Sequence, residues 1–217
     1  MSLEDFPEFD QAVRLHLDQA ADALVDEFGG IYSEAHVRAV VDESAARLFD
    51  GNVAAYVPIL AKRFARERLQ AQARFEGKMA RDETEVLFVS LTGGGRAQMA
   101  AALLARATGE TVRAHTAGSG SAAALDPAVV VVMEELGVDM AESFTRPLTP
   151  EVLAGADVVV TMGKSVGVVD VPPTTRHVDW RVGDPSGADV EEARRVREDI
   201  ERRIEALARE VAAGPAG

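Results

Sequence analysis

A glycine-rich turn between an apolar segment and a helical segment is the strongest candidate for chemistry in this sequence. Its residues are Ser90, Leu91, Thr92, Gly93, Gly94, Gly95 and Arg96. Backbone N–H groups converge at such a turn, the dipole of the following helix favours negative charge, and an arginine can grip two oxygens of one anion. We therefore expect residues 91–96 to bind a tetrahedral oxyanion, which is phosphate, sulfate or an arsenate-like anion.

Ser90 begins this turn and occupies the position of a nucleophile. A serine hydroxyl is not ionised at pH 7, so it needs an adjacent general base in order to attack. The pattern of the sequence places no histidine within reach of Ser90, and we expect each of the four to be structural. They are His16, His36, His115 and His177. The chain has no cysteine, which excludes disulfides, thiolate metal sites and thiol redox chemistry in this chain.

Asp184 is the second candidate catalytic residue. It begins an Asp-Pro-Ser-Gly turn after a predicted strand. By composition alone this segment is an ordinary turn. Ligands of an open parallel sheet bind beyond the carboxyl ends of its strands, and this shared position groups Ser90, residues 117–119, Gly163 and Asp184 at one edge.

The first part of the chain, residues 1–82, shows helical patterns only. Apolar side chains recur at helical spacing over residues 7–28, 34–49 and 53–75, and short glycine-containing turns separate these segments. Ser33 is placed to cap the second helix. We predict a small three-helix bundle.

Residues 83–217 alternate between strand and helix patterns, which predicts an α/β domain. The expected strands are residues 85–90, 111–116, 157–162 and 176–180, and the expected helices are residues 96–108, 126–136, 150–154 and 190–211. Strands separated by helices predict a four-stranded parallel sheet with helices on both faces. Thr149 is the expected cap of the short third helix.

The composition restricts the partners of the protein. A formal net charge of −13 over 217 residues disfavours non-specific binding to nucleic acid or to an anionic membrane. The sequence shows neither a long apolar run nor a basic and apolar leader, so we expect a cytoplasmic protein. We predict no metal site and no cofactor.

The second region resembles the low-molecular-weight protein tyrosine phosphatase superfamily, and more specifically the arsenate reductases of that fold. The similar segments are residues 86–89, 96–100, 116–119, 126–127, 135–138, 146–149, 156–163, 179–180 and 184–185. The helical first region is similar to an extension found on some actinobacterial members. The resemblance implies that Arg96 and the loop stabilise an oxyanion and that Asp184 is the general acid.

Three departures from the family pattern bear on activity. Ser90 stands where the family has its nucleophilic cysteine, and Ala97 stands where the family has a hydroxyl residue that helps to hold the thiolate. Residues 163–166 stand where many arsenate reductases carry a cysteine. Such a loop cysteine has a pKa of roughly 3.5–7.5, whereas a serine hydroxyl has no comparable ionised form.

These observations leave three hypotheses about function. The favoured one is a pseudoenzyme that keeps the oxyanion pocket and serves in binding, regulation or assembly, with a homodimer formed through the N-terminal helices. The second is a repurposed enzyme that acts on a phosphorylated or carboxylated metabolite through Ser90, Arg96 and Asp184. The least favoured is a working arsenate reductase or tyrosine phosphatase, because the required thiolate is absent.

Overall fold

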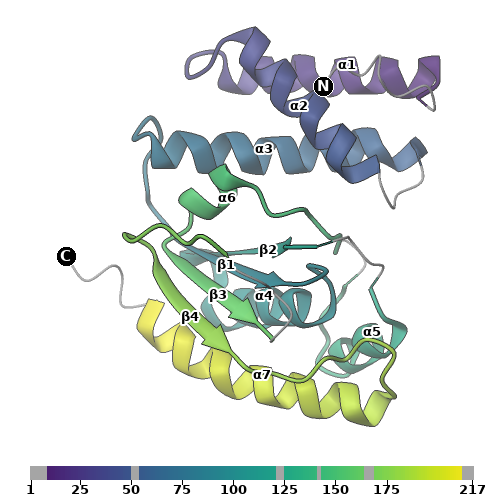
Figure 1. Ribbon diagram of the computed structural model, residues 1–217, viewed down its shortest axis with the longest axis vertical. Helices are drawn as coiled ribbons and strands as arrows, with labels where there is room; N and C mark the ends of the chain where they lie inside the picture. The colour runs from purple at the N-terminus through teal and green to yellow at the C-terminus, as the bar shows by residue number, and fades with distance from the viewer. Residues whose placement is uncertain (1–8, 50–53, 121–124, 141–142, 164–168, 212–217) are drawn as a thin grey trace. The chain divides into compact units, whose positions relative to one another are not determined.

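The computed structural model describes residues 9–49, 54–120, 125–140, 143–163 and 169–211, and it divides into two compact units (Figure 1). The first unit comprises residues 1–80 and 149–155, and the second comprises residues 81–148 and 156–217. The predicted residues 164–166 lie outside the described residues. No helix in the described part of the chain is long and apolar enough to span a bilayer.

The first unit is built on α1 (Gln11–Phe28), α2 (Glu34–Phe49) and α3 (Val57–Phe75). Asp10 caps α1, because its carboxylate accepts a hydrogen bond from the backbone N of Val13 at 2.8 Å. The predicted cap of α2 is confirmed: the Ser33 hydroxyl accepts from the backbone N of His36 at 3.3 Å. A 3-10 turn, η2 (Ala54–Tyr56), precedes α3, and Pro58 lies in the first turn of α3, where a missing N–H is tolerated.

A buried arginine on α3 connects this bundle to α6 (Pro150–Ala154). Arg68 donates a hydrogen bond to the carboxylate of Glu151 on α6 and another, at 2.8 Å, to the carboxylate of Glu43 on α2. The hydrogen bond from Arg68 lowers the pKa of the Glu43 carboxyl. The prediction for Thr149 is corrected in one respect: it is the cap residue of α6 by position, but its side chain makes no capping hydrogen bond.

The second unit contains a four-stranded sheet in the order β2-β1-β3-β4, with every neighbouring pair parallel. The strands are β1 (Thr84–Ser90), β2 (Val112–Gly118), β3 (Val158–Met162) and β4 (Arg176–Trp180). The predicted four-stranded parallel sheet with helices and an N-terminal helical region is therefore confirmed. β2 extends past its predicted end at residue 116 because Gly118 pairs in register with Ser90, the last residue of β1.

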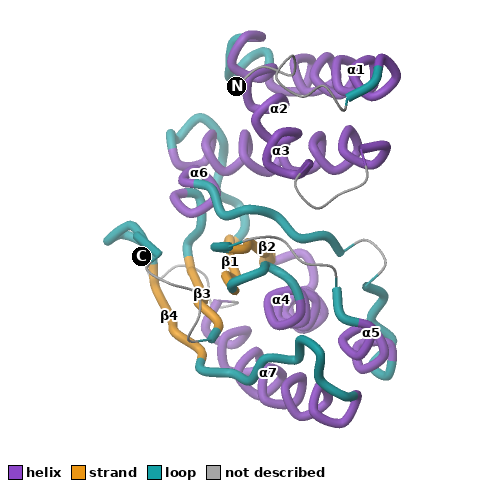
Figure 2. The backbone as a smooth tube through the Cα atoms, turned by 45° about the vertical axis from the view of Figure 1, so that its right-hand side comes forward, coloured by secondary structure: helices purple, strands orange, loops and turns teal. Residues whose placement is uncertain are grey.

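Three helices of this unit share one core with one set of strand side chains. They are α4 (Gly95–Thr108), α5 (Pro127–Glu134) and α7 (Val190–Val211), and a 3-10 turn, η3 (Gly109–Thr111), follows α4. Buried residues from these helices pack with Val86 and Phe88 of β1 and Val160 of β3 (Figure 2). This packing fixes the first turn of α4 directly beyond the end of the central strand β1.

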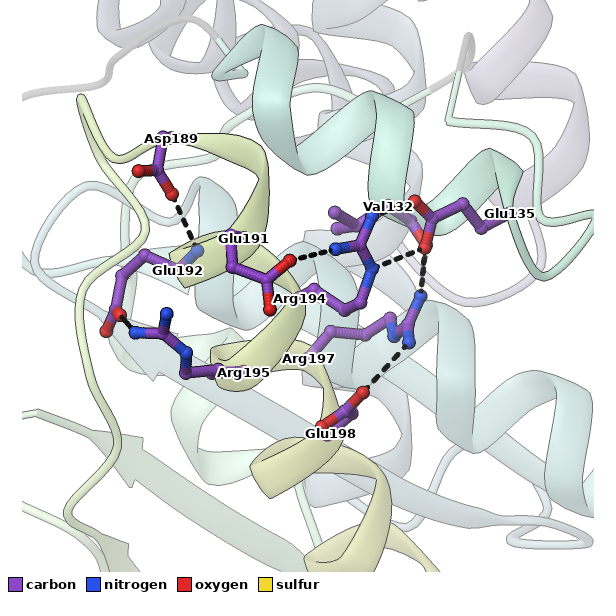
Figure 3. Close-up of polar contacts among 9 residues, drawn as sticks. All are labelled: Val132, Glu135, Asp189, Glu191, Glu192, Arg194, Arg195, Arg197 and Glu198. Carbon is purple, nitrogen blue, oxygen red and sulfur yellow. Dashed lines mark hydrogen bonds and ion pairs between the residues drawn. The ribbon is translucent and has the colours of Figure 1, made fainter.

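A cluster of arginine and glutamate side chains ties α5 to α7 (Figure 3). Glu135, at the end of α5, receives hydrogen bonds from Arg194 at 2.5 Å and from Arg197 at 2.9 Å. Arg197 also donates to the carbonyl oxygen of Val132 at 2.8 Å. These two arginines, Arg194 first, hold the pKa of the Glu135 carboxyl at about 2, below its ordinary 4.5.

Candidate functional site

The glycine-rich turn lies at the middle of the carboxyl edge of the sheet. Its backbone touches the end of β2, because the amide N of Ser119 donates to the carbonyl oxygen of Ser90 at 3.0 Å. Gly93 has a φ of +67°, and a Cβ there would lie 2.7 Å from the backbone N of Gly118. Only glycine satisfies both the left-handed conformation and the close approach of the two backbones.

Two loop hydroxyls accept hydrogen bonds from loop amides. The Ser90 hydroxyl is almost fully buried and accepts from the amide N of Gly93 at 3.0 Å. The hydroxyl of Thr92 accepts from the amide N of Gly94 at 3.3 Å. The amides of this turn thus point toward the side of the loop on which Ser90 lies, and the turn holds its shape through its own side chains.

Gln98, in the first part of α4, supports the loop from beneath. Its buried side-chain amide donates to the carbonyl oxygen of Gly93 at 3.2 Å and to the hydroxyl of Thr116 on β2 at 2.9 Å. It also donates to the carbonyl oxygen of Phe144 at 2.9 Å. Gln98 therefore joins the loop, β2 and the segment before residue 146. Sequence analysis assigned it no role, because its partners are distant in the chain.

Arg96 is buried and turned toward the ends of β3 and β4. Its Nη2 lies 3.1 Å from Oδ2 of Asp184, and its Nη1 donates to the carbonyl oxygen of Gly183 at 3.4 Å. Gly163, directly after β3, has a φ of +89°, and a Cβ there would lie 2.4 Å from Nη1 of Arg96. The structure thus brings Arg96 and Asp184 together and shows that Gly163 leaves room for the guanidinium.

The segment that carries Asp184 is held by α5. The backbone N of Gly187 donates to Oδ2 of Asp126 at 2.8 Å, while Oδ1 of Asp126 caps α5 by accepting from the amide N of Ala128 at 2.9 Å. Pro185 is buried over Gly95, where a Cβ would lie 3.0 Å from the proline ring. Sequence analysis placed Asp126 at the start of a helix and gave it no part in the site.

Two histidines of the sheet have partners other than Ser90. The imidazole of His115 pairs with the carboxylate of Glu85, and Nε2 of His177 lies 3.0 Å from the hydroxyl of Thr161. Among the described residues, the contact recorded for the Ser90 hydroxyl is with the amide of Gly93. The described part of the chain also holds no group of three or more His, Asp or Glu side chains that could hold a metal ion.

The chemistry that this arrangement supports is oxyanion binding next to a carboxyl group. A helix of 14 residues begins at the loop, so its dipole and its first amides favour an anion there. Arg96 supplies a fixed positive charge, and Asp184 supplies a carboxyl group that can give or take a proton. Ser90 lacks a base among these contacts, so the arrangement provides no means of activating its hydroxyl.

Two family models cover most of the chain. The first part matches the "Protein-tyrosine-phosphatase-like, N-terminal domain" over residues 17–73. The second part matches "Low molecular weight phosphotyrosine protein phosphatase" over residues 85–215. A putative arsenate reductase of Halobacterium salinarum is 34% identical to this chain over 126 residues, which are 56% of this chain and 88% of that relative.

Solved structures show the same similarity. The thioredoxin-dependent arsenate reductase of Corynebacterium glutamicum superposes with a TM-score of 0.82 at 32% identity, and the match covers 91% of this chain and 96% of that one. An arsenate reductase in a phosphate-binding state has a TM-score of 0.52 at 26% identity, covering 59% of this chain and 98% of that one. The chain belongs to the low molecular weight phosphotyrosine protein phosphatase family and is similar to its arsenate reductases.

Proposed function

We propose that this protein binds a tetrahedral oxyanion in the loop formed by residues 90–96 and does not carry out the thiolate chemistry of its family. The observation that carries the proposal is the buried hydroxyl of Ser90, which lies against the Gly93 amide in a chain that has no cysteine. The oxyanion-binding parts remain: the loop amides, the start of α4 and the guanidinium of Arg96. Binding, regulation or assembly is the role that such a site can serve.

The absence of a thiol decides against arsenate reduction. The reaction consumes two electrons and passes through a thiol adduct, and this chain supplies neither. An oxyanion pocket without a nucleophile can still report the presence of an anion or hold an anionic group of a partner. A homodimer through the first three helices and a cytoplasmic location stay predictions.

Calorimetric titration of the full chain with sulfate, phosphate and arsenate tests the proposal. We expect binding that Arg96→Ala weakens roughly ten- to hundredfold, because a charged hydrogen-bond donor of this kind contributes about 1.5–3 kcal/mol. Arg106→Ala is the matched control, since Arg106 lies on the same helix and donates to the carbonyl oxygen of Leu136. Turnover of an aryl phosphate well above background that Arg96→Ala abolishes would overturn the proposal.

A second candidate is a repurposed enzyme, and the proximity of Asp184 to Arg96 favours it. The carboxyl group lies 3.1 Å from the guanidinium and is more than half exposed, so it could exchange a proton with a bound phosphorylated or carboxylated metabolite. This candidate predicts that Asp184→Asn abolishes an activity while anion binding persists. Screening a broad panel of metabolites with the wild-type chain and this variant decides it, and the absence of any turnover rejects it.

A further inference from the structure

The carboxylate of Asp184 already occupies the arginine that a bound anion would use. Its Oδ2 lies 3.1 Å from Nη2 of Arg96, and the carbonyl oxygen of Gly183 accepts from Nη1 at 3.4 Å. The Arg96 side chain is only 8% exposed, so few other positions are open to it, whereas the Asp184 side chain is 56% exposed. An anion gripped by both guanidinium nitrogens must therefore replace these two acceptors.

The acceptors belong to a segment that is anchored on both sides of Asp184. Residues 183–187 are called here the closing segment. Asp126 holds its end through the backbone N of Gly187, at 2.8 Å, and Pro185 is buried over Gly95 at the start of α4. The amide N of Ser186 donates to Oδ1 of Asp184 at 3.1 Å, which fixes the other carboxylate oxygen. Asp184 is thus presented to Arg96 by a supported turn.

We propose that Asp126 positions the closing segment so that the Asp184 carboxylate competes with a bound oxyanion for Arg96, and that the anion binds as this ion pair opens. The inference rests on the oxyanion pocket proposed above. Because solvent reaches Asp184, the pair is weak enough to open at modest cost. Competition therefore lowers the affinity for the anion without abolishing it. Asp126 acts as a positioning residue, since it contacts the segment and not the guanidinium.

The charge of the probe distinguishes displacement of Asp184 from simple repulsion by it. If the carboxylate leaves Arg96, the same ion pair is broken for every anion, and its removal strengthens the binding of a monoanion and a dianion by the same factor. If the carboxylate stays and repels the ligand, the dianion gains twice the free energy of the monoanion, because the Coulomb energy is proportional to charge. Sulfate and perchlorate are tetrahedral oxyanions that carry two charges and one charge, respectively.

The experiment is calorimetric titration of the full chain with sulfate and with perchlorate. We expect Asp184→Asn to lower both dissociation constants by the same factor, roughly three- to tenfold. Asp179→Asn is the matched control: it removes an exposed carboxylate on β4 that bonds to the Thr161 hydroxyl, and we expect less than about a twofold change. Thermal unfolding of each variant verifies that it is folded.

A serine at position 126 tests the positioning role. Serine can still cap α5, but its shorter side chain does not reach both α5 and Gly187. We expect Asp126→Ser to strengthen sulfate binding in the wild-type background and to add nothing in the Asp184→Asn background. An additional gain in the Asp184→Asn background would overturn the assignment of Asp126.

The remaining outcomes separate this inference from the proposed function. Sulfate binding by Asp184→Asn but not by the wild type would support the competition in its strongest form. Equal sulfate affinities for the two proteins would overturn the competition and leave the pocket standing, and a sulfate gain equal to the square of the perchlorate gain would overturn displacement. If neither protein binds either anion at the highest concentrations that calorimetry allows, the oxyanion pocket is refuted and the competition with it.

Discussion

Gly163 controls the position of Arg96 because it has no side chain. A Cβ at residue 163 would lie 2.4 Å from Nη1 of Arg96, which is closer than any real contact of this kind. We predict that Gly163→Ala moves the guanidinium and weakens sulfate binding by roughly tenfold, since a displaced arginine loses a charged hydrogen bond. Calorimetry of the variant measures the loss.

The matched control for this prediction is Gly137→Ala. Gly137 also has a positive φ, +71°, but nothing lies within 4 Å of the Cβ that alanine would add. Both variants carry the backbone strain of an L-residue in the left-handed region, which costs about 1 kcal/mol. Only Gly163→Ala meets Arg96, so equal effects of the two substitutions on sulfate binding would contradict the explanation.

Ser90 and Ala97 together decide whether the ancestral chemistry can be restored. In the double variant Ser90→Cys, Ala97→Ser, the new thiol would lie where the Ser90 hydroxyl now receives the Gly93 amide. That amide and the start of α4 favour a thiolate. We predict hydrolysis of an aryl phosphate by the double variant, measured by product release. Ser119→Cys supplies a thiol at the end of β2 as a control and should stay at background.

At the scale of elements, Glu135 makes the connection between α5 and α7 dependent on pH. Arg194 and Arg197 lower the pKa of its carboxyl from 4.5 to about 2 in the folded protein. The folded state therefore binds this proton less readily than the unfolded state, and the stabilisation is complete above pH 4.5 and lost as the pH falls through 2. We predict that Glu135→Gln destabilises the protein at pH 7 and that its deficit shrinks as the pH falls.

Urea unfolding of the wild type and of Glu135→Gln between neutral and acidic pH measures this deficit. Glu191→Gln is the control: Glu191 contacts Arg194 within one turn of α7 and is 62% exposed, so its removal should change stability little. A deficit for Glu135→Gln that stays constant as the pH falls would show that packing, not ionisation, is responsible.

Arg68 plays the corresponding part in the first unit, where one buried guanidinium joins three helices. Arg68→Met leaves the carboxylates of Glu43 and Glu151 without their common partner. We predict a loss of about 2–3 kcal/mol in the free energy of unfolding, less than for a fully buried pair because both carboxylates reach solvent. Adding Glu43→Gln and Glu151→Gln should recover part of this loss in urea titrations, and no recovery would contradict the ionic explanation.

At the scale of the whole molecule, the two compact units do not coincide with two continuous stretches of chain. Residues 149–155 belong to the first unit, although the chain before and after them belongs to the second. Arg68 explains this assignment through its bond to Glu151, and so does Gly155, where an added Cβ would lie 2.7 Å from Cβ of Ala71 on α3. The division into domains at residues 82 and 83 is a proposal that truncation can test.

We predict that a chain of residues 81–217 folds its sheet but leaves residues 149–155 unprotected. The core residues of the sheet, α4, α5 and α7 pack against one another within the second unit, so the sheet retains its main source of stability. The short α6 loses Arg68 and Ala71. Hydrogen exchange should then be slow in β1 and β3 and fast over residues 149–155. Failure of the sheet to form would contradict the proposed domains.

Local features of this protein followed from the sequence by itself. The apolar run before Ser90, the three glycines and Arg96 predicted a strand, a turn and a helix, because these preferences depend on neighbouring residues. The parallel sheet followed from the alternation of strands and helices, and the cap at Ser33 followed from its side chain. The absence of cysteine excluded thiol chemistry without any structure.

Only the tertiary structure decided which distant residues meet at the site. The register of the sheet places Gly118 beside Ser90, and the packing of α5 brings Asp126 to the backbone N of Gly187, 61 positions further along the chain. No local preference encodes the ion pair between Arg96 and Asp184 or the space that Gly163 leaves for the guanidinium. Such contacts depend on how whole elements pack, because burial and excluded volume act between segments whatever their separation in sequence.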